Sequence, residues 1–315
     1  MKKKKLILIM MLCAITLSAT GCTTLLKDEK GKAVQNPVTG QNLPKNILCR
    51  PESKKTIEVY EDNKIELNKL PKCSEFVPAS GGYEGIWTTI FVKPLAWIII
   101  QIGKIVKNYG LAVILITLLI RMIMFPLTQK SAVQSENLKL AKPELDKLEK
   151  KYKNRQDQEA MMQKSQEMLV IYKKYKINPM AGCLYAFIQL PLFLAFYEAL
   201  NRLPLIFEGS FLGLHLGMTP LTGITSGRIY YIIIVILVGS VTYYSFKLNS
   251  GASMSEDQAK QMKMMTNIMT GVITLSSLTI SSAIGLYWIT NSGFTIVQNL
   301  IVKRRKNNGK DSNRR

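Results

Sequence analysis

The sequence lacks several motifs on which enzymes depend. It contains a single histidine, His215, so a serine protease acting within the membrane, which needs a serine and a histidine together, is poorly supported. Its five cysteines show no CxxC and no Cys/His spacing, which gives no indication of a metal site. There is no GxxxxGKS or GxxxxGKT motif, and hence no sign of an ATP-binding loop. We therefore expect a protein that is not an enzyme and needs no metal or cofactor.

Acidic residues are scarce. The chain has 21 Asp and Glu against 42 Lys and Arg, which gives a formal net charge of +21 at pH 7. Such an excess is found in nucleic-acid-binding proteins, but here it is concentrated beside long apolar stretches. Lys and Arg are enriched on the cytoplasmic side of membrane spans. The charge therefore indicates membrane topology first, and DNA is not expected as a partner.

The hydrophobic residues, 47% of the chain, come in blocks. Blocks of about 17 to 25 residues that are nearly free of charge have the length that a helix needs to cross a bilayer. The sequence therefore predicts an all-α polytopic membrane protein with five transmembrane helices. The predicted spans are residues 110–127, 179–200, 229–247, 263–280 and 283–302.

The charged segments between these blocks predict the orientation. The insert 128–178 and the tail 303–315 are dense in Lys and Arg, so both are expected in the cytoplasm. The short segment 248–262 then also lies inside, and the loop 201–228 lies outside. Two residues of that outer loop fit the rule poorly, Arg202 and Arg228. Five spans place the N-terminus outside the cell membrane of a bacterium and the C-terminus in the cytoplasm.

The N-terminus resembles an export signal. Residues 1–21 combine a basic start, an apolar stretch and small residues, which is typical of a signal peptide. The residues Ala19-Thr20-Gly21-Cys22 resemble a lipobox, in which Cys22 would receive a lipid anchor after cleavage. The alternative is an ordinary signal-peptidase site. Both interpretations place the mature N-terminus outside the cytoplasm.

Residues 22–82 are polar and turn-rich, which predicts a small domain or a tether. Cys49 and Cys73 bracket the alternating stretch "KTIEVYED", and one disulfide between them is a candidate in an oxidising exterior. Two unpaired thiols are the alternative.

Residues 83–109 contain an apolar stretch that is interrupted by Lys93 and Lys104. Its longest uncharged run, 94–103, has about half the length of a span. We therefore expect an amphipathic helix in the outer membrane interface, anchored by Trp87 and Trp97. A sixth transmembrane helix is the alternative.

The insert 128–178 has the pattern of a helical hairpin. Its apolar residues recur at helical spacing in two stretches that can pack antiparallel. The first stretch has Leu138, Leu145, Leu148 and Tyr152, and the second has Met161, Ser165, Met168, Tyr172 and Tyr175. The basic faces provide solubility or contact anionic lipid or ribosomal RNA.

One charge lies inside an apolar block, Arg121 in "LITLLIRMIMFPLT". An arginine at the centre of a membrane helix costs about 2.5 to 3.5 kcal/mol on insertion scales, so it normally faces the protein interior or a wet cavity. Arg121 is therefore a candidate functional residue. The alternative is that its side chain snorkels to the lipid headgroups.

Three segments together resemble the signature segments of the YidC family of membrane protein insertases. They are "GLAVILITLLIRMIMFPLTQKS", "KKYKINPMAGCLYAFIQLPLFLAFYEAL" and "GLYWITNSGFTIVQNLIVKRR", in that order. The resemblance covers roughly residues 87–305 and leaves 22–82 outside. The leader resembles that of the Gram-positive branch. One departure is "LTISSAIGLYW", which lacks the family's proline before the last span, although its serines are still expected to satisfy backbone groups.

The resemblance implies a hydrophilic groove, open to the cytoplasm and to lipid, in which Arg121 lies. Further groove candidates are Thr117, Gln189, Tyr287 and Trp288. Each has a structural alternative: Thr117 bonds its own i−4 carbonyl, Gln189 bonds between helices, and Trp288 belongs to the interfacial aromatic belt.

The implied function is insertion of nascent membrane proteins, alone or with the Sec translocon, in contact with membrane lipids. A ribosome is a candidate partner of the basic tail. The alternative function is a small-solute or anion transporter that uses Arg121 as its binding site, although no inverted repeat is apparent.

Overall fold

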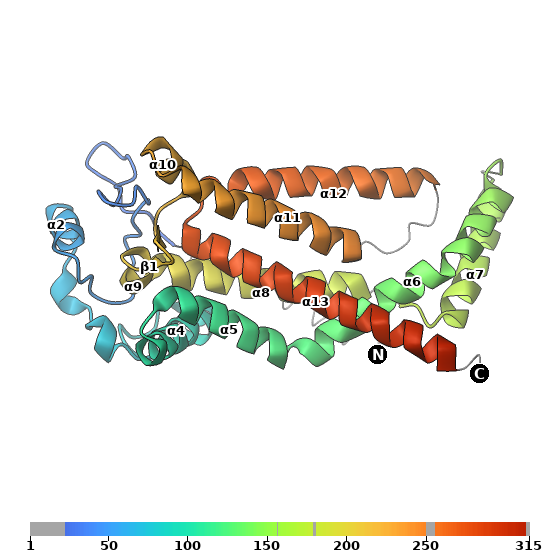
Figure 1. Ribbon diagram of the computed structural model, residues 1–315, viewed down its shortest axis with the longest axis horizontal. Helices are drawn as coiled ribbons and strands as arrows, with labels where there is room; N and C mark the ends of the chain where they lie inside the picture. Colours follow the sequence, from blue (N-terminus) through green and yellow to red (C-terminus); the bar gives the residue numbers. More distant parts are fainter. Residues whose placement is uncertain (1–22, 156, 179–180, 250–255, 313–315) are drawn as a thin grey trace. The chain divides into compact units, whose positions relative to one another are not determined.

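The computed structural model describes residues 23–155, 157–178, 181–249 and 256–312 (Figure 1). The expected signal sequence and the candidate lipidation residue Cys22 lie outside the described residues. The described chain is mostly helical, which confirms the all-α part of the expected fold class; the count of five spans stays a prediction. It forms two compact units. The first contains the residues up to Leu119 with Phe187–Val238 and Leu275–Thr290, and the second contains Ile120–Ala186, Gly239–Thr274 and the residues from Asn291 onward.

The elements are bounded as follows. The first part of the chain has the α-helices α2 (Lys54–Asp62), α3 (Gly85–Trp87) and α4 (Lys93–Val106), the 3₁₀ turns η1 (Leu67–Lys69) and η2 (Cys73–Glu75), and the π-helical η3 (Thr88–Val92). The long helices are α5 (Tyr109–Ile123), α6 (Phe125–Tyr152), α7 (Gln158–Lys174), α8 (Ala181–Arg202), α11 (Ile232–Asn249), α12 (Glu256–Ser276) and α13 (Ser282–Ser312). The loop between α8 and α11 has α9 (Pro204–Phe207), α10 (Pro220–Thr225), η4 (Ile229–Tyr231) and the antiparallel strands β1 (Ser210–Phe211) and β2 (Leu214–His215), in which Ser210 pairs with His215.

Two described helical segments are long and apolar enough to cross a bilayer. Gly85–Val106 has 22 residues and Ile229–Leu248 has 20, and an 18-residue stretch within each has a mean hydropathy of 1.6 and 1.9, respectively. A third span results if the bent pair Tyr109–Ile123 and Phe125–Tyr152 is counted as one. Helices α8, α12 and α13 occupy the other predicted spans, but they do not meet this measure over their described residues.

The first of these segments is longer than its charge pattern predicted. Lys93 interrupts the apolar run, yet its side chain is fully buried and α3, η3 and α4 continue through it as one helical segment. A buried, paired lysine does not end a helix, so the uncharged run underestimated the length. Its place in the outer interface stays a prediction.

The first predicted span, 110–127, is broken. Helix α5 ends at Ile123, and α6 begins at Phe125 after a bend of 70°. Pro126 lies in the first turn of α6, where its missing N–H and its ring cannot continue the preceding helix. The break therefore follows from a proline that the apolar pattern ignored.

Helices α12 and α13 extend beyond their apolar blocks. Helix α12 begins at Glu256, inside the expected loop 248–262, and α13 continues to Ser312, through most of the expected tail. Lys, Arg, Gln and Met are good helix formers, so a helix need not end where hydrophobicity ends.

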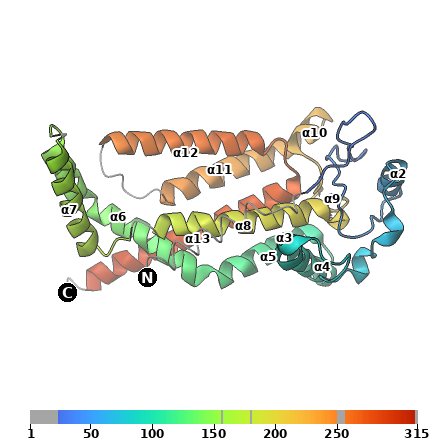
Figure 2. The same ribbon diagram turned by 180° about the vertical axis from the view of Figure 1, so that it is seen from behind.

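Helices α6 and α7 pack against each other side by side, as both views show (Figure 2). Their shared core is formed by Ala141, Leu145, Leu148, Tyr152, Ala160 and Tyr172, with Leu138, Met168, Ile171, Tyr175 and Ile177 packed on it. The prediction that Met161 and Ser165 lie on the packed face of the second helix was wrong, because Met161 is 61% exposed and Ser165 is exposed. The inward face of α7 instead begins at Ala160.

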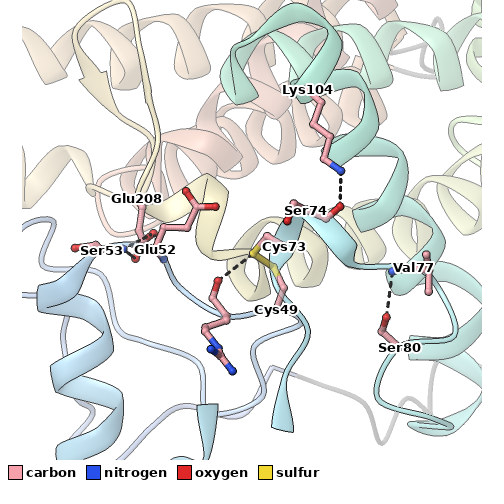
Figure 3. The surroundings of a disulfide bond; sticks show 10 residues. Cys49, Glu52, Ser53, Cys73, Ser74, Val77, Ser80, Lys104 and Glu208 are labelled. Carbon is pink, nitrogen blue, oxygen red and sulfur yellow. Dashed lines mark hydrogen bonds between the residues drawn. A yellow bond between two sulfur atoms is a disulfide. The ribbon is translucent and has the colours of Figure 1, made fainter. Parts of the chain in front are cut away.

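The N-terminal segment, residues 23–82, is a folded part of the first unit. Its apolar cluster is formed by Leu26, Leu43, Ile47, Tyr60 and Leu67, and Phe207 of α9 completes it. The stretch "KTIEVYED" lies in helix α2. Cys49 and Cys73 form a disulfide in the structure (Figure 3). The segment is therefore packed on the rest of its unit and is not a loose tether.

The turn between α12 and α13 is stabilised without proline. The Ser282 hydroxyl donates to the carbonyl of Met218 at 2.7 Å, and the Ser282 and Ala283 amides donate to Met218 and Leu216 carbonyls at 3.0 and 2.9 Å. The expectation that serine satisfies backbone groups here is confirmed for Ser282.

Candidate functional site

Arg121 lies in the last turn of α5 and is buried, with 2% of its surface exposed. Its Nε donates a hydrogen bond of 2.6 Å to Oδ1 of Asn291 on α13. Both residues belong to the second unit. The side chain therefore points against protein, whereas a snorkelling arginine would extend its head away from it.

The bond to Asn291 orients the guanidinium group. Nε can only donate, so the Asn291 amide must present its oxygen, and a charge-assisted bond of this length is among the strong ones. Arginine stays protonated at physiological pH. The pair thus holds a permanent positive charge in one orientation. Such a charge can attract an anionic group but cannot serve as an acid or base.

A second polar contact lies seven residues further along each of the two segments. Gln298 Nε2 donates to Thr128 Oγ1 at 2.8 Å, and both side chains are buried. Because 121 and 128 are seven residues apart, as are 291 and 298, the two contacts form a two-rung polar ladder between the chain at the α5–α6 bend and α13.

The sequence predictions missed Asn291, Thr128 and Gln298. Helix α13 buries a polar stripe that is formed by Asn291, Ser292, Thr295, Gln298 and Asn299. These residues recur at spacings of three and four in "NSGFTIVQN", and this spacing on one helix face is the signal that could have found them.

Thr117 lies one turn before Arg121 on α5 and is 1% exposed. Its hydroxyl donates to the Val113 carbonyl at 2.6 Å. The bond to the carbonyl four residues earlier, which was the structural alternative, is thus formed. A role of Thr117 in a groove stays a prediction.

The other three candidates gather in one aromatic cluster of the first unit. Tyr287 is buried and stacks on Phe196 with ring centroids 4.4 Å apart. Trp288 is half-buried and meets Phe193 edge-on at 5.4 Å. Gln189 Nε2 lies 3.5 Å from the Tyr287 hydroxyl, a long hydrogen bond between α8 and α13. This cluster belongs to the first unit, whereas Arg121 belongs to the second.

A model of the 60Kd inner membrane protein family matches residues 101–310. "Membrane protein insertase YidC" of Oceanobacillus iheyensis is 33% identical over 75% of this chain and 91% of its own length. The same-named protein of Alkalihalophilus pseudofirmus is 34% identical over 70% of this chain and 83% of its own. "Membrane protein insertase MisCA" of Bacillus subtilis is 33% identical over 72% and 82%.

A solved structure, an active YidC insertase with its first transmembrane domain resolved, has a similar fold. The TM-score is 0.50 at 22% sequence identity, and the match covers 77% of this chain. The chain spans about half of that solved chain, 52% of its length. The matched residues contain Arg121, Asn291 and the aromatic cluster, and on these grounds the chain belongs to the YidC family of membrane protein insertases.

Proposed function

We propose that this protein is a membrane protein insertase that receives segments of nascent membrane proteins beside Arg121 and releases their apolar helices into the bilayer. Its relatives carry the name of that activity. The observation in this chain that carries the proposal is the buried guanidinium of Arg121, held by Asn291. A charge within an apolar membrane helix is costly, which supports a role of Arg121 in binding.

The proposed topology has five spans, with α6 and α7 as a cytoplasmic hairpin. The N-terminus lies outside, anchored through Cys22, and the basic end of α13 lies in the cytoplasm. The density of Lys and Arg in 128–178 and 303–315 supports this orientation. The helical segment Gly85–Val106 is long enough to span, but a sixth span would put both ends of the chain on the same side of the membrane, so this segment is assigned to the outer interface.

The proposed mechanism rests on solvation and charge. A groove that is open to the cytoplasm lets a short polar segment of the client enter part-way without losing all its hydration. The positive charge of Arg121 attracts acidic client residues, and a low local dielectric strengthens that attraction. The client's apolar helix then moves into lipid because its own transfer free energy favours the bilayer.

The aromatic cluster has a proposed role in the same process. Trp288 is half-buried, and Gln189 is as well, so both have surface left for a client. Tyr287 is almost fully buried and supports Trp288 through their shared contact with Phe193. The Sec translocon is a proposed partner, and a translating ribosome would meet the basic residues Lys303, Arg304 and Arg305.

Photocrosslinking from the site tests the proposal. A photoreactive amino acid at position 117 or 121 of the full-length protein is expected to crosslink to a stalled nascent membrane protein in native membranes. Position 105 is the matched control, because Ile105 is 79% exposed on α4. Equal crosslinking from all three positions, or none from 117 and 121, would contradict client contact. Selective uptake of a small anion instead would favour the transporter alternative.

Asn291 is expected to position Arg121. Asn291→Ala removes the acceptor of Arg121 Nε, and a hydrogen bond to a charged group is worth about 1.5 to 3 kcal/mol, so insertion should fall about tenfold or more. Asn291→Asp keeps an acceptor oxygen but adds a negative charge, so it should impair clients with acidic outer segments more than neutral ones. Insertion assays with both client types provide the measurement.

The matched control for this prediction is Asn299→Ala on the same helix face, since Asn299 Nδ2 donates to the Thr295 carbonyl of its own helix. An equal loss of insertion activity in Asn291→Ala and Asn299→Ala would show that removing any side-chain amide from α13 impairs the protein. It would contradict the role of Asn291 in positioning Arg121.

A further inference from the structure

Two basic residues of the first unit do not fit the pattern of apolar helices and cytoplasmic positive charge. Lys93 interrupts an apolar helix, and Arg202 ends α8 on the side where the positive-inside rule disfavours basic residues. In the structure their side chains are the most buried of all described basic residues of that unit, with 0% and 1% exposed. A buried cation requires a partner, so the groups that surround these two residues indicate what the site is for.

Lys93 is held by the residues just before its helix. Its Nζ donates to the carbonyls of Ser80 and Gly82 at 2.8 and 2.7 Å and lies 2.9 Å from Oε1 of Glu84. All three donor positions of the ammonium group are thereby used. Each partner comes from the end of the N-terminal segment or the residues that link it to α3.

Arg202 is held by the same carboxylate and by the same segment. Its Nη2 lies 2.6 Å from Oε2 of Glu84, and its Nε donates to the Asn46 carbonyl at 2.6 Å. The backbone continues the contact, since the Leu48 amide donates to the Arg202 carbonyl at 3.0 Å. Glu84 therefore bridges both buried cations.

A second carboxylate, that of Glu198, contributes less to neutralising Arg202. Glu198 Oε1 accepts from the Trp87 indole at 2.9 Å, but its Oε2 lies 3.9 Å from Arg202 Nη1, beyond hydrogen-bond distance. The pKa of Glu84 shows which carboxylate dominates. Burial raises this pKa, but the hydrogen bonds from Lys93 and Arg202 outweigh burial and lower it below its ordinary value. Glu84 is thus the main counter-ion.

Further contacts join the N-terminal segment to the same helices. Gln41 Nε2 donates to Asn201 Oδ1 at 3.3 Å. Figure 3 shows Glu208, whose carboxylate accepts from the Glu52 and Ser53 amides at 3.0 and 3.3 Å, and Lys104, which donates to the Ser74 carbonyl at 2.6 Å. Phe207 enters the apolar cluster of the segment. The contacts thus reach α4 and the α8–α9 junction.

We propose that residues 23–84 form a permanent cap on α4 and the α8–α9 junction, locked by Glu84 as the shared counter-ion of Lys93 and Arg202. The only carboxylate that the helices themselves place near these two charges in the described residues is Glu198, 3.9 Å from Arg202. Without the cap, Lys93 would lose its contacts to Ser80, Gly82 and Glu84, and Arg202 would keep only the longer contact to Glu198, so we expect the two parts to fold together. The cap lies outside the family match, which begins at residue 101, and the proposal does not depend on what Arg121 binds.

Limited proteolysis of the full-length protein in membranes tests the lock. Trypsin should cleave the cap, at exposed sites such as Lys54 and Lys55, at least tenfold faster in Glu84→Gln than in the wild type. Glu66→Gln is the matched control, because Glu66 pairs with Lys69 on the surface of the same segment. Adding Arg202→Met to Glu84→Gln should slow cleavage again, since it removes one unpaired cation. Unchanged cleavage in Glu84→Gln would overturn the proposal.

A second measurement keeps the proposal testable if Glu84→Gln fails to fold. Cysteines in place of Gln41 and Asn201 should form an oxidative crosslink in membranes from cells, seen as fragments that stay joined after cleavage between them. Glu29→Cys with Asn201→Cys is the control, because the Glu29 side chain is 95% exposed and pairs with Lys64 of the cap itself. Absence of the crosslink in the first pair, or equal crosslinking in both, would show that the cap is not docked.

Discussion

Arg121→Ala is expected to abolish growth of a strain that depends on this protein, whereas Arg121→Lys is expected to keep it. Two unit charges 4 Å apart attract by about 4 kcal/mol at an effective dielectric constant of 20. Loss of even a third of that energy weakens client binding about tenfold. Lysine keeps the charge but cannot reproduce the Nε bond to Asn291, so growth should be slower than in the wild type.

The measurement is complementation in a depletion strain, with membrane levels of each variant followed by immunoblot. Arg228→Ala is a matched control, because Arg228 is a half-buried arginine in the loop before α11. Full growth with Arg121→Ala at normal protein level would mean that the charge is dispensable. The insertase activity would then have to be sought in the α6–α7 hairpin.

The paired change Cys49→Ala and Cys73→Ala is expected to destabilise the cap by about 3 kcal/mol, the loop entropy for a bridge across a loop of this size. The bridge spans 24 residues of sequence. Near Cys49, Asn46 and Leu48 hydrogen-bond to Arg202. Next to Cys73, the Ser74 carbonyl accepts a hydrogen bond from Lys104. The bridge joins these two attachment points. Loss of the bridge should therefore loosen both attachments together.

Thermal unfolding in detergent and the trypsin cleavage rate of the cap measure this effect. Cleavage should accelerate by roughly two orders of magnitude if local opening exposes the sites, because each 1.4 kcal/mol is a factor of ten. Cys183→Ala, which removes a cysteine outside the pair, should change neither quantity. Unchanged cleavage in the paired variant would show that packing on Phe207 and Arg202 holds the cap without the bridge.

Most of the helices could be predicted from the sequence, and most of their ends could not. The apolar blocks marked α5, α8, α11, α12 and α13, because burial in lipid or protein requires runs of apolar side chains. The end of α5 at Ile123 depends on a proline, and the extension of α12 and α13 over polar residues depends on the helix propensity of those residues. Hydrophobicity carries no information on either.

Some residues of the candidate site could likewise be found from the sequence, and others could not. Arg121 was found because a charge in an apolar run is a local anomaly. The aromatic cluster was found only through resemblance to the family, since Tyr287 and Trp288 are ordinary residues for a membrane helix. Asn291 was missed because the apolar pattern takes no account of the three- and four-residue spacing of the polar residues in α13, and because the sequence does not show which helix this face meets.

Composition and periodicity alone therefore predicted a helical membrane protein and one candidate arginine, and the three signature segments carried the resemblance to the family, because these are properties of short stretches of chain. The partners of its buried charges are not local. Asn291 is 170 residues from Arg121, and Glu84 is 118 residues from Arg202. Burial demands that each charge be met, but which group meets it depends on how distant helices pack. Only the tertiary structure decided that Arg121 is held by α13 and that the N-terminal segment packs against Lys93 of α4 and Arg202 of α8.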